Sequence, residues 1–150
     1  MALKQRITDD IKAALLGGDR FVGETLKNLK AAILNEEVAQ NKRDEGLDDA
    51  TIEQIIAREV KKRSESVKMY EQGGRADLAE NEQKEMDVIK VYLPEQLGED
   101  QIQVIVDAAI QQLGASGMSD MGKVIGVVKA KVGNTADGAL VAKIVKEALN

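Results

Sequence analysis

Apolar residues recur every three or four positions along almost the whole chain, and no segment shows the sustained alternation of a strand. This pattern predicts an all-α protein with seven helices. The first predicted helix covers residues 3–16 and ends at Gly17-Gly18, and the second begins after Asp19. Their apolar faces are Leu3, Ile7, Ile11 and Ala14 in the first and Val22, Leu26, Leu29 and Ile33 in the second.

Two longer helices and then a boundary are predicted next. Asp48 or Asp49 caps the third helix, which Gly73-Gly74 closes, and the fourth helix follows. Pro94, the only proline, disfavours a helical conformation at Leu93 and lacks a backbone donor. We therefore expect an N-terminal domain of four helices over residues 1–94. The expected buried positions are Ile52, Ile56, Val60, Val67 and Tyr70 in the third helix and Leu78, Met86, Ile89 and Leu93 in the fourth.

A C-terminal domain of three helices is predicted over residues 95–150. Its first helix starts at Gly98 and is followed by a loop over residues 114–119, and Asp137 caps its last helix. The expected buried positions are Ile102, Val106, Ala109, Leu113, Met121, Val124, Ile125, Val128, Val132, Leu140, Val141, Ile144, Val145 and Ala148.

The composition excludes several classes of function. The chain has no histidine and no cysteine, which removes the common proton shuttle, thiolate chemistry and the favoured zinc ligands. We therefore expect no catalytic centre of these kinds, no metal and no cofactor. Three aromatic residues leave little scope for stacking on bases. No apolar run suits a signal peptide or a membrane span, so we expect a cytoplasmic protein with no membrane partner.

Charge is unevenly distributed along the chain. The net charge is −5, yet residues 95–120 hold five acidic and no basic residues, whereas residues 121–150 hold five lysines against Asp137 and Glu147. The last thirty residues therefore carry a net charge of +3 (five minus two). A basic end on an acidic protein permits a local site for a polyanion.

Charged residues also fall on predicted core faces. Helical periodicity puts Arg63 on the apolar stripe of the third helix, with Glu59 at its edge, and puts Glu82 and Glu85 on the apolar face of the fourth. These residues could form paired carboxylates for acid–base work or a metal site, or a buried ion-pair network. We favour the network, because the guanidinium of arginine binds carboxylates bidentately and no histidine completes a di-iron pattern.

Small residues recur in the sixth predicted helix. Gly122, Gly126 and Ala130 lie four positions apart, roughly opposite the apolar stripe, with Lys123 and Lys129 beside them. Glycine inside a helix lowers its stability by roughly 0.5–1 kcal/mol relative to alanine, so we expect another group to approach the helix backbone closely at these positions. The approaching group could be an RNA backbone or a neighbouring helix. A phosphate loop over residues 117–124 is rejected, because Val124 replaces the Ser/Thr that should hold magnesium.

Four segments, in order, resemble the GatB/YqeY family, and in particular its stand-alone YqeY type. They are Gly74-Arg75-Ala76-Asp77-Leu78-Ala79 with Glu82 and Glu85, then Tyr92-Leu93-Pro94 with Gln96 and Leu97, then Asp120-Met121-Gly122-Lys123-Val124-Ile125-Gly126, and Ala136-Asp137-Gly138. The resemblance implies a four-helix bundle followed by a three-helix bundle. It also implies kinship with the tRNA-holding tail of the B subunit of glutamine-dependent aspartyl/glutamyl-tRNA amidotransferase, a carbon–nitrogen ligase whose catalytic parts have no counterpart in this chain.

These observations together suggest a function. We expect a non-catalytic accessory module that binds tRNA, or a tRNA-handling enzyme, but not DNA, through its C-terminal domain. The alternatives are a protein-interaction module without RNA contact and, third, an enzyme built on Glu82 and Glu85. The residues expected at the RNA are Lys123, Lys129, Lys143, Lys146, Gly122 and Gly126.

Overall fold

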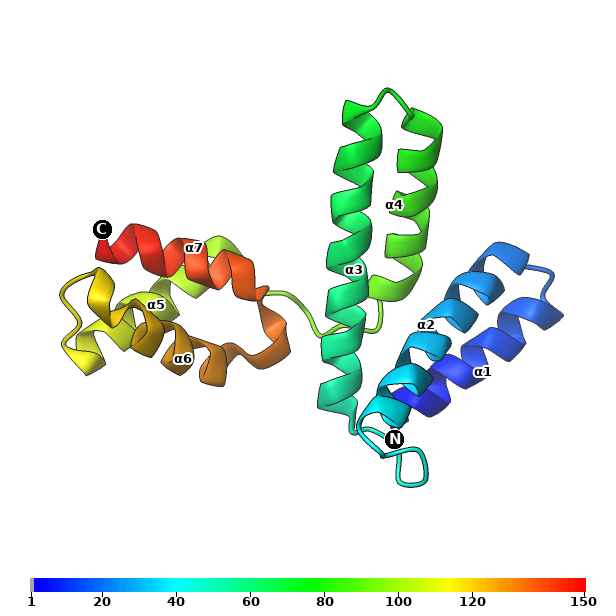
Figure 1. Ribbon diagram of the computed structural model, residues 1–150, viewed down its shortest axis with the longest axis horizontal. Helices are drawn as coiled ribbons and strands as arrows, with labels where there is room; N and C mark the ends of the chain where they lie inside the picture. The colour runs from blue at the N-terminus through cyan, green and yellow to red at the C-terminus, as the bar shows by residue number, and fades with distance from the viewer. Residues whose placement is uncertain (1) are drawn as a thin grey trace. The chain divides into compact units, whose positions relative to one another are not determined.

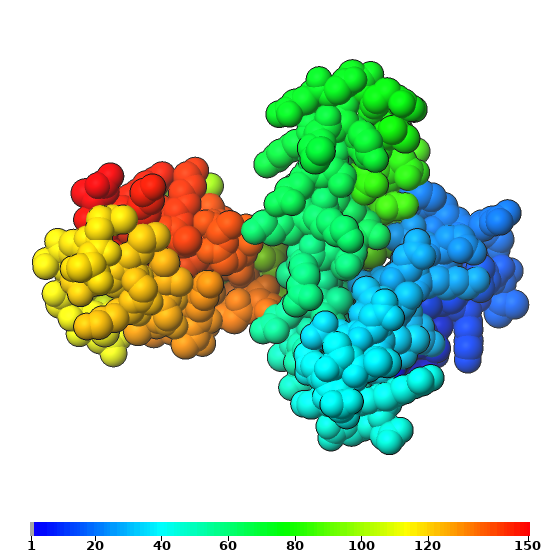
Figure 2. Space-filling model, viewed as in Figure 1, coloured from blue at the N-terminus to red at the C-terminus, as the bar shows by residue number. Residues whose placement is uncertain are grey.

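A computed structural model describes residues 2–150 (Figures 1 and 2), and these residues contain seven α-helices and no strand. The all-helical prediction and the number of α-helices are confirmed. Chain contacts divide the protein between Leu93 and Pro94 into two compact parts, which we call unit 1 and unit 2. Unit 1 contains α1 (Ala2–Leu16), α2 (Arg20–Ala39), α3 (Asp49–Gln72) and α4 (Ala76–Lys90). Unit 2 contains α5 (Glu99–Leu113), α6 (Met121–Val132) and α7 (Gly138–Leu149), with short 3₁₀ turns η1 (Met118–Asp120) and η2 (Gly133–Thr135).

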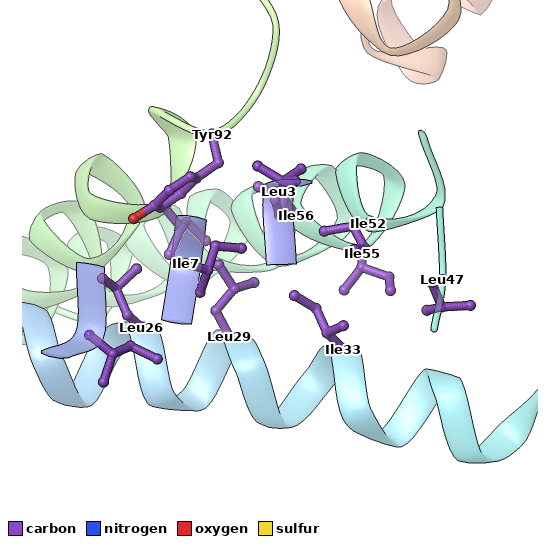
Figure 3. Close-up of a cluster of buried hydrophobic side chains, with 12 residues drawn as sticks. Leu3, Ile7, Leu26, Leu29, Ile33, Leu47, Ile52, Ile55, Ile56 and Tyr92 are labelled. Carbon is purple, nitrogen blue, oxygen red and sulfur yellow. The ribbon is translucent and has the colours of Figure 1, made fainter. Parts of the chain in front are cut away.

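Local chemistry sets the helix boundaries in unit 1. The carboxylate of Asp19 accepts a hydrogen bond from the backbone of Val22 and caps α2, and that of Asp48 accepts one from Thr51 and caps α3. The α1–α2 turn contains Gly18 at φ +78°, a left-handed conformation that favours glycine. The two hairpins α1–α2 and α3–α4 pack on each other through aliphatic side chains. Figure 3 shows these side chains converging from α1, α2, α3 and the loop after α2, with the ring of Tyr92 at one side.

The outer half of the α3–α4 hairpin is less buried than the sequence led us to expect. Ile52 and Ile56 are fully buried, but Val60, Val67 and Tyr70 are only half-buried. The expectation assumed one continuous core along α3. The contacts of α1 and α2 with α3 are much less extensive than those of α4, so the outer turns of α3 are covered mainly by α4. Periodicity identifies the face of a helix that turns inward, but it does not say how far the covering helices extend.

Unit 2 has a core made only of aliphatic side chains. Branched residues from all three helices fill it, and Leu97 packs against it from the segment that precedes α5. That segment is held in place by polar contacts: the backbone N–H of Leu97 donates to the carbonyl of Thr135 at 2.7 Å, and the side-chain amide of Gln96 donates to the carbonyl of Asn134 at 3.0 Å. The buried core residues are Ile102, Val106, Ala109, Val124, Val128, Val132, Val141, Ile144, Val145 and Leu149.

Candidate functional site

The segment before α6 is not a phosphate loop. Residues 118–120 form the turn η1, and Gly122 already lies inside α6. The carboxylate of Asp120 accepts a hydrogen bond from the backbone N–H of Ser116, so a negative charge occupies the position where a phosphate loop would present free amides. The rejection of nucleotide binding by this segment agrees with its geometry.

The lysines proposed from the sequence all lie on exposed positions of α6 and α7. Lys123, Lys129, Lys143 and Lys146 are solvent-exposed, and none of their ammonium groups forms an ion pair with a described residue. The buried aliphatic residues of α6 and α7 occupy the inward faces of these helices, which leaves the lysines on the outward faces. The positive charge of this surface is therefore available to an outside anion.

The glycines of α6 face open space. An added Cβ at Gly122 or at Gly126 would meet no atom within 4 Å, and Ala130 is exposed as well. Within unit 2, therefore, no neighbouring helix packs against this glycine face. The sequence pattern could not decide this, because a smooth helix face looks the same whether it is covered or bare.

The α6–α7 hairpin distributes the lysines over its length. The two helices run antiparallel, so the start of α6 and the end of α7 lie at the same end of unit 2 (Figure 1). Lys123 and Lys146 belong to that end. Lys129 lies at the other end, where a Cβ built on Gly138 at the start of α7 would be 3.5 Å from its ammonium nitrogen. We use the name lysine–glycine surface for these exposed residues of α6 and α7: Lys123, Lys129, Lys143, Lys146, Gly122 and Gly126.

The ion cluster of unit 1 joins α3 to α4. A guanidinium nitrogen of Arg63 is 2.8 Å from the carboxylate of Glu59, and its Nε is 3.3 Å from that of Glu85. The Arg63 side chain is only 13% exposed, so the two contacts satisfy a largely buried charge. Glu82 lines the same small cavity, together with Lys62 and Ser66, without an ion pair to Arg63.

This arrangement suits a structural network better than an acid–base pair. Arg63 pairs with the carboxylates of both Glu59 and Glu85, so these two groups compensate its largely buried charge. No group of three or more acidic residues in the described part of the chain is arranged to hold a metal ion. What the cluster can do is fix the register of α3 against α4.

A second buried charge was missed from the sequence. Glu37, near the end of α2, is fully buried, and one of its oxygens lies 2.7 Å from the ammonium of Lys4 on α1. The other oxygen has no hydrogen-bond partner among the described residues. A signal was available, because residue 37 lies four positions after Ile33 on the buried stripe of α2.

Tyr92 anchors the end of unit 1. Its hydroxyl donates to the carboxylate of Asp10 at 2.5 Å, and the guanidinium of Arg6 lies over its ring at 4.8 Å from the centroid. Burial, and then the hydrogen bond to the negatively charged Asp10, raise the pKa of Tyr92 well above its usual value of 10.0. The tyrosine is thus held neutral, as a donor, in the motif that precedes Pro94.

None of the helices described is both long and apolar enough to cross a membrane.

Comparison with known proteins gives a consistent family. A family model described as Yqey-like protein matches residues 4–149. Among curated proteins, the chain is 28% identical over 145 residues to altered inheritance of mitochondria protein 41, mitochondrial, of Pyrenophora tritici-repentis, covering 95% of this chain and 78% of that protein. It is 34% identical over 87 residues to the protein of the same name from Eremothecium gossypii, covering 58% of this chain and 46% of the relative. For the Saccharomyces cerevisiae protein of that name the identity is 27% over 124 residues, covering 83% and 59%.

The names of these relatives contradict the cytoplasmic location expected from the sequence, because each is named as a mitochondrial protein. The argument from the sequence was too narrow. It looked for the apolar run of a secretory signal, whereas mitochondrial targeting segments are amphipathic and basic. The matched part of the chain also spans only 46% of the length of the Eremothecium gossypii protein and 59% of that of the Saccharomyces cerevisiae protein. The family model covers nearly all of the chain, and the protein therefore belongs to the YqeY-like family.

Proposed function

We propose that this protein is a non-catalytic accessory module of tRNA metabolism that holds tRNA by its sugar–phosphate backbone. In this proposal the lysine–glycine surface of unit 2 is the contact. The finer arrangement implied by the resemblance, a four-helix bundle followed by a three-helix bundle related to the tRNA-holding tail of the amidotransferase, is part of the same proposal.

The observation that carries the proposal is the open glycine face beside unpaired lysines. Gly122 and Gly126 lower the intrinsic stability of α6 and meet no neighbour inside unit 2. Lys123 lies beside them and is exposed, and it forms no ion pair with any of residues 2–150. A phosphate backbone needs both features, because it must come close to the helix and its charge must be neutralised.

Recognition in this proposal uses shape and phosphates. Unit 2 contains no aromatic residue, so bases have no ring to stack on. We therefore expect little discrimination between tRNA species by this chain alone. If three lysines neutralise about three phosphates, the logarithm of the affinity should fall against the logarithm of salt concentration with a slope of roughly −2 to −3.

Titration of labelled tRNA with the full chain at several salt concentrations tests the proposal. Total tRNA and mitochondrial tRNA should both be used, because the relatives are named mitochondrial. The triple variant Lys123→Ala, Lys143→Ala, Lys146→Ala should bind weakly and with a flatter salt slope. The matched control removes the same charge from exposed lysines elsewhere, at Lys42, Lys61 and Lys68. Equal loss in the control, or no binding at low salt, would refute the proposal.

One observation favours a second candidate, a protein-interaction module without RNA contact. Helix α5 exposes Glu99, Asp100 and Asp107, and the whole chain carries a net charge of −5, which opposes a polyanion at long range. Capture of partners with the full chain, with and without RNase, separates the two candidates. Partners that are lost on RNase treatment support the RNA contact, and partners retained on the triple variant support the protein interaction.

A further inference from the structure

The segment between α4 and α5 is the only connection between unit 1 and unit 2 (Figure 1). Its first part is fixed to unit 1. Tyr92 is buried, and its hydroxyl donates to the carboxylate of Asp10. Leu93 packs against the core of unit 1, and its backbone N–H donates to the carbonyl of Lys90 at 3.1 Å. The chain therefore belongs to unit 1 as far as Leu93.

The last part of the segment is fixed to unit 2. Leu97 packs against the core of unit 2, and its backbone N–H donates to the carbonyl of Thr135 at 2.7 Å. The side-chain amide of Gln96 donates to two carbonyls, that of Asn134 at 3.0 Å and that of Pro94 at 2.8 Å. Gln96 thus ties the carbonyl of Pro94 to the turn η2, which contains Asn134.

Only Pro94 and Glu95 lie between these two attachments. Glu95 is exposed, and neither its backbone N–H nor its carboxylate bonds to any of residues 2–150. The ring of Pro94 holds its φ at about −65°, and it restricts Leu93 to extended conformations. While Gln96 holds the carbonyl of Pro94, the units can turn relative to each other only about the few bonds between Leu93 and that carbonyl. When Gln96 releases the carbonyl, the φ and ψ of Glu95 become free as well.

We propose that Pro94 and Glu95 form a hinge between the two units and that the side chain of Gln96 is its catch. With the catch closed, unit 2 turns over a narrow range relative to unit 1, and with the catch open it turns over a wider one. Both bonds of the catch are exposed and join neutral groups, so water competes for the same donors and acceptors and their net contribution is small. The closed and the open state are therefore both populated. The hinge does not depend on what unit 2 binds.

Pulsed electron paramagnetic resonance between two spin labels measures the range of the hinge. The chain has no cysteine, so Met69→Cys and Gln112→Cys, at exposed positions, place one label in each unit. Met69→Cys with Leu16→Cys places both labels on exposed positions of unit 1 and gives the distance distribution within a single body. We expect the distribution between the units to be broader than this reference.

Variants of the segment identify the catch. Gln96→Ala should broaden the distribution between the units, because it frees the torsions of Glu95, and Pro94→Gly should broaden it by removing the ring. The matched control is Gln83→Ala, which removes another exposed glutamine side chain, bonded to Asp87 at 3.0 Å, and should leave the width unchanged. A native distribution as narrow as the reference would overturn the hinge. A width that Gln96→Ala leaves unchanged, or that Gln83→Ala changes equally, would overturn the catch.

Amide ¹⁵N relaxation of the full chain locates the hinge residue by residue. In Gln96→Ala the order parameter of the Glu95 amide should fall below about 0.6, whereas those of Tyr92 and Leu97 should stay near about 0.85, the value of rigid backbone. Leu97 should stay rigid because it keeps its bond to Thr135. A fall at Leu97 as large as that at Glu95 would place the flexible bonds beyond Gln96 and overturn the proposal. The Tm and the helical circular dichroism signal should match those of the native chain, because the Gln96 side chain lies outside both cores.

Discussion

The ion pair between Lys4 and Glu37 makes a quantitative prediction about unit 1. Lys4→Met leaves the Glu37 carboxylate fully buried, with neither oxygen bonded to a described residue. Removing one partner of a buried pair costs roughly 3–5 kcal/mol. Because the Lys4 side chain is 24% exposed, the lower end applies, and we expect a loss of about 3 kcal/mol. With a urea slope of about 1.5 kcal/mol/M, the unfolding midpoint should fall by about 2 M.

The double variant Lys4→Met, Glu37→Met separates the loss of a pair from the exposure of an unpaired charge. Methionine has about the volume of glutamate and leaves no buried polar atom at either position. Replacing a buried ion pair by apolar residues is often neutral or stabilising, so the double variant should lie within about 1 kcal/mol of the native chain. The single variant should therefore be much less stable than the double.

Tyrosine fluorescence during urea unfolding is the suitable assay. Both tyrosines, Tyr70 and Tyr92, belong to unit 1, so their emission reports this unit alone, while circular dichroism reports both units. The reasoning fails if Lys4→Met loses less than about 1 kcal/mol, or if the double variant is as unstable as the single one.

Three further predictions test other features. Arg63→Met should lower the free energy of unfolding of unit 1 by about 2 kcal/mol in the same assay, because it removes two partly screened charge-assisted contacts. The control Arg75→Met, which breaks an exposed ion pair, should change this free energy by less than about 0.5 kcal/mol. Because the pKa of Tyr92 is raised in the folded state, its contribution to stability is fully present below pH 10 and is lost as the pH rises. The free energy of unfolding of the native chain should therefore fall by about 1 kcal/mol between pH 10 and 11 from this group alone, and in Tyr92→Phe this part of the fall should be absent. Gly122→Ala and Gly126→Ala should each raise the stability of unit 2 by roughly 0.5–1 kcal/mol, and a lower Tm would reveal a hidden packing contact.

Helix positions were predictable from the sequence because their determinants are local. The caps at Asp48 and Asp137 and the break at Gly17-Gly18 act within one turn of chain, and the structure has helix ends at each. The burial of Val67 and Tyr70 was overestimated because it depends on how far other helices extend, which periodicity does not contain.

The candidate sites were predictable to different degrees. Arg63 was placed on an inward face by periodicity, and the structure gives Glu59 and Glu85 as its partners, but not Glu82. Glu37 was missed because the apolar face of the second helix was followed only as far as Ile33, although position 37 continues the same stripe one turn further on. The exposure of the lysines follows from the apolar stripes of α6 and α7, whereas RNA binding by them stays a prediction.

The composition of α6 has a consequence for how unit 2 responds to a ligand. Two glycines and five β-branched residues among its twelve residues give α6 a low intrinsic helix propensity. A segment of this length is not helical by itself in water. Its helicity depends on Val124, Val128 and Val132 being covered by α5 and α7. The surface that carries Gly122 and Gly126 therefore exists only while unit 2 is assembled. A ligand that binds only the folded surface must raise the Tm of unit 2, because it stabilises the folded state by RT ln(1 + [L]/Kd), so the thermal shift measured against ligand concentration reports the affinity.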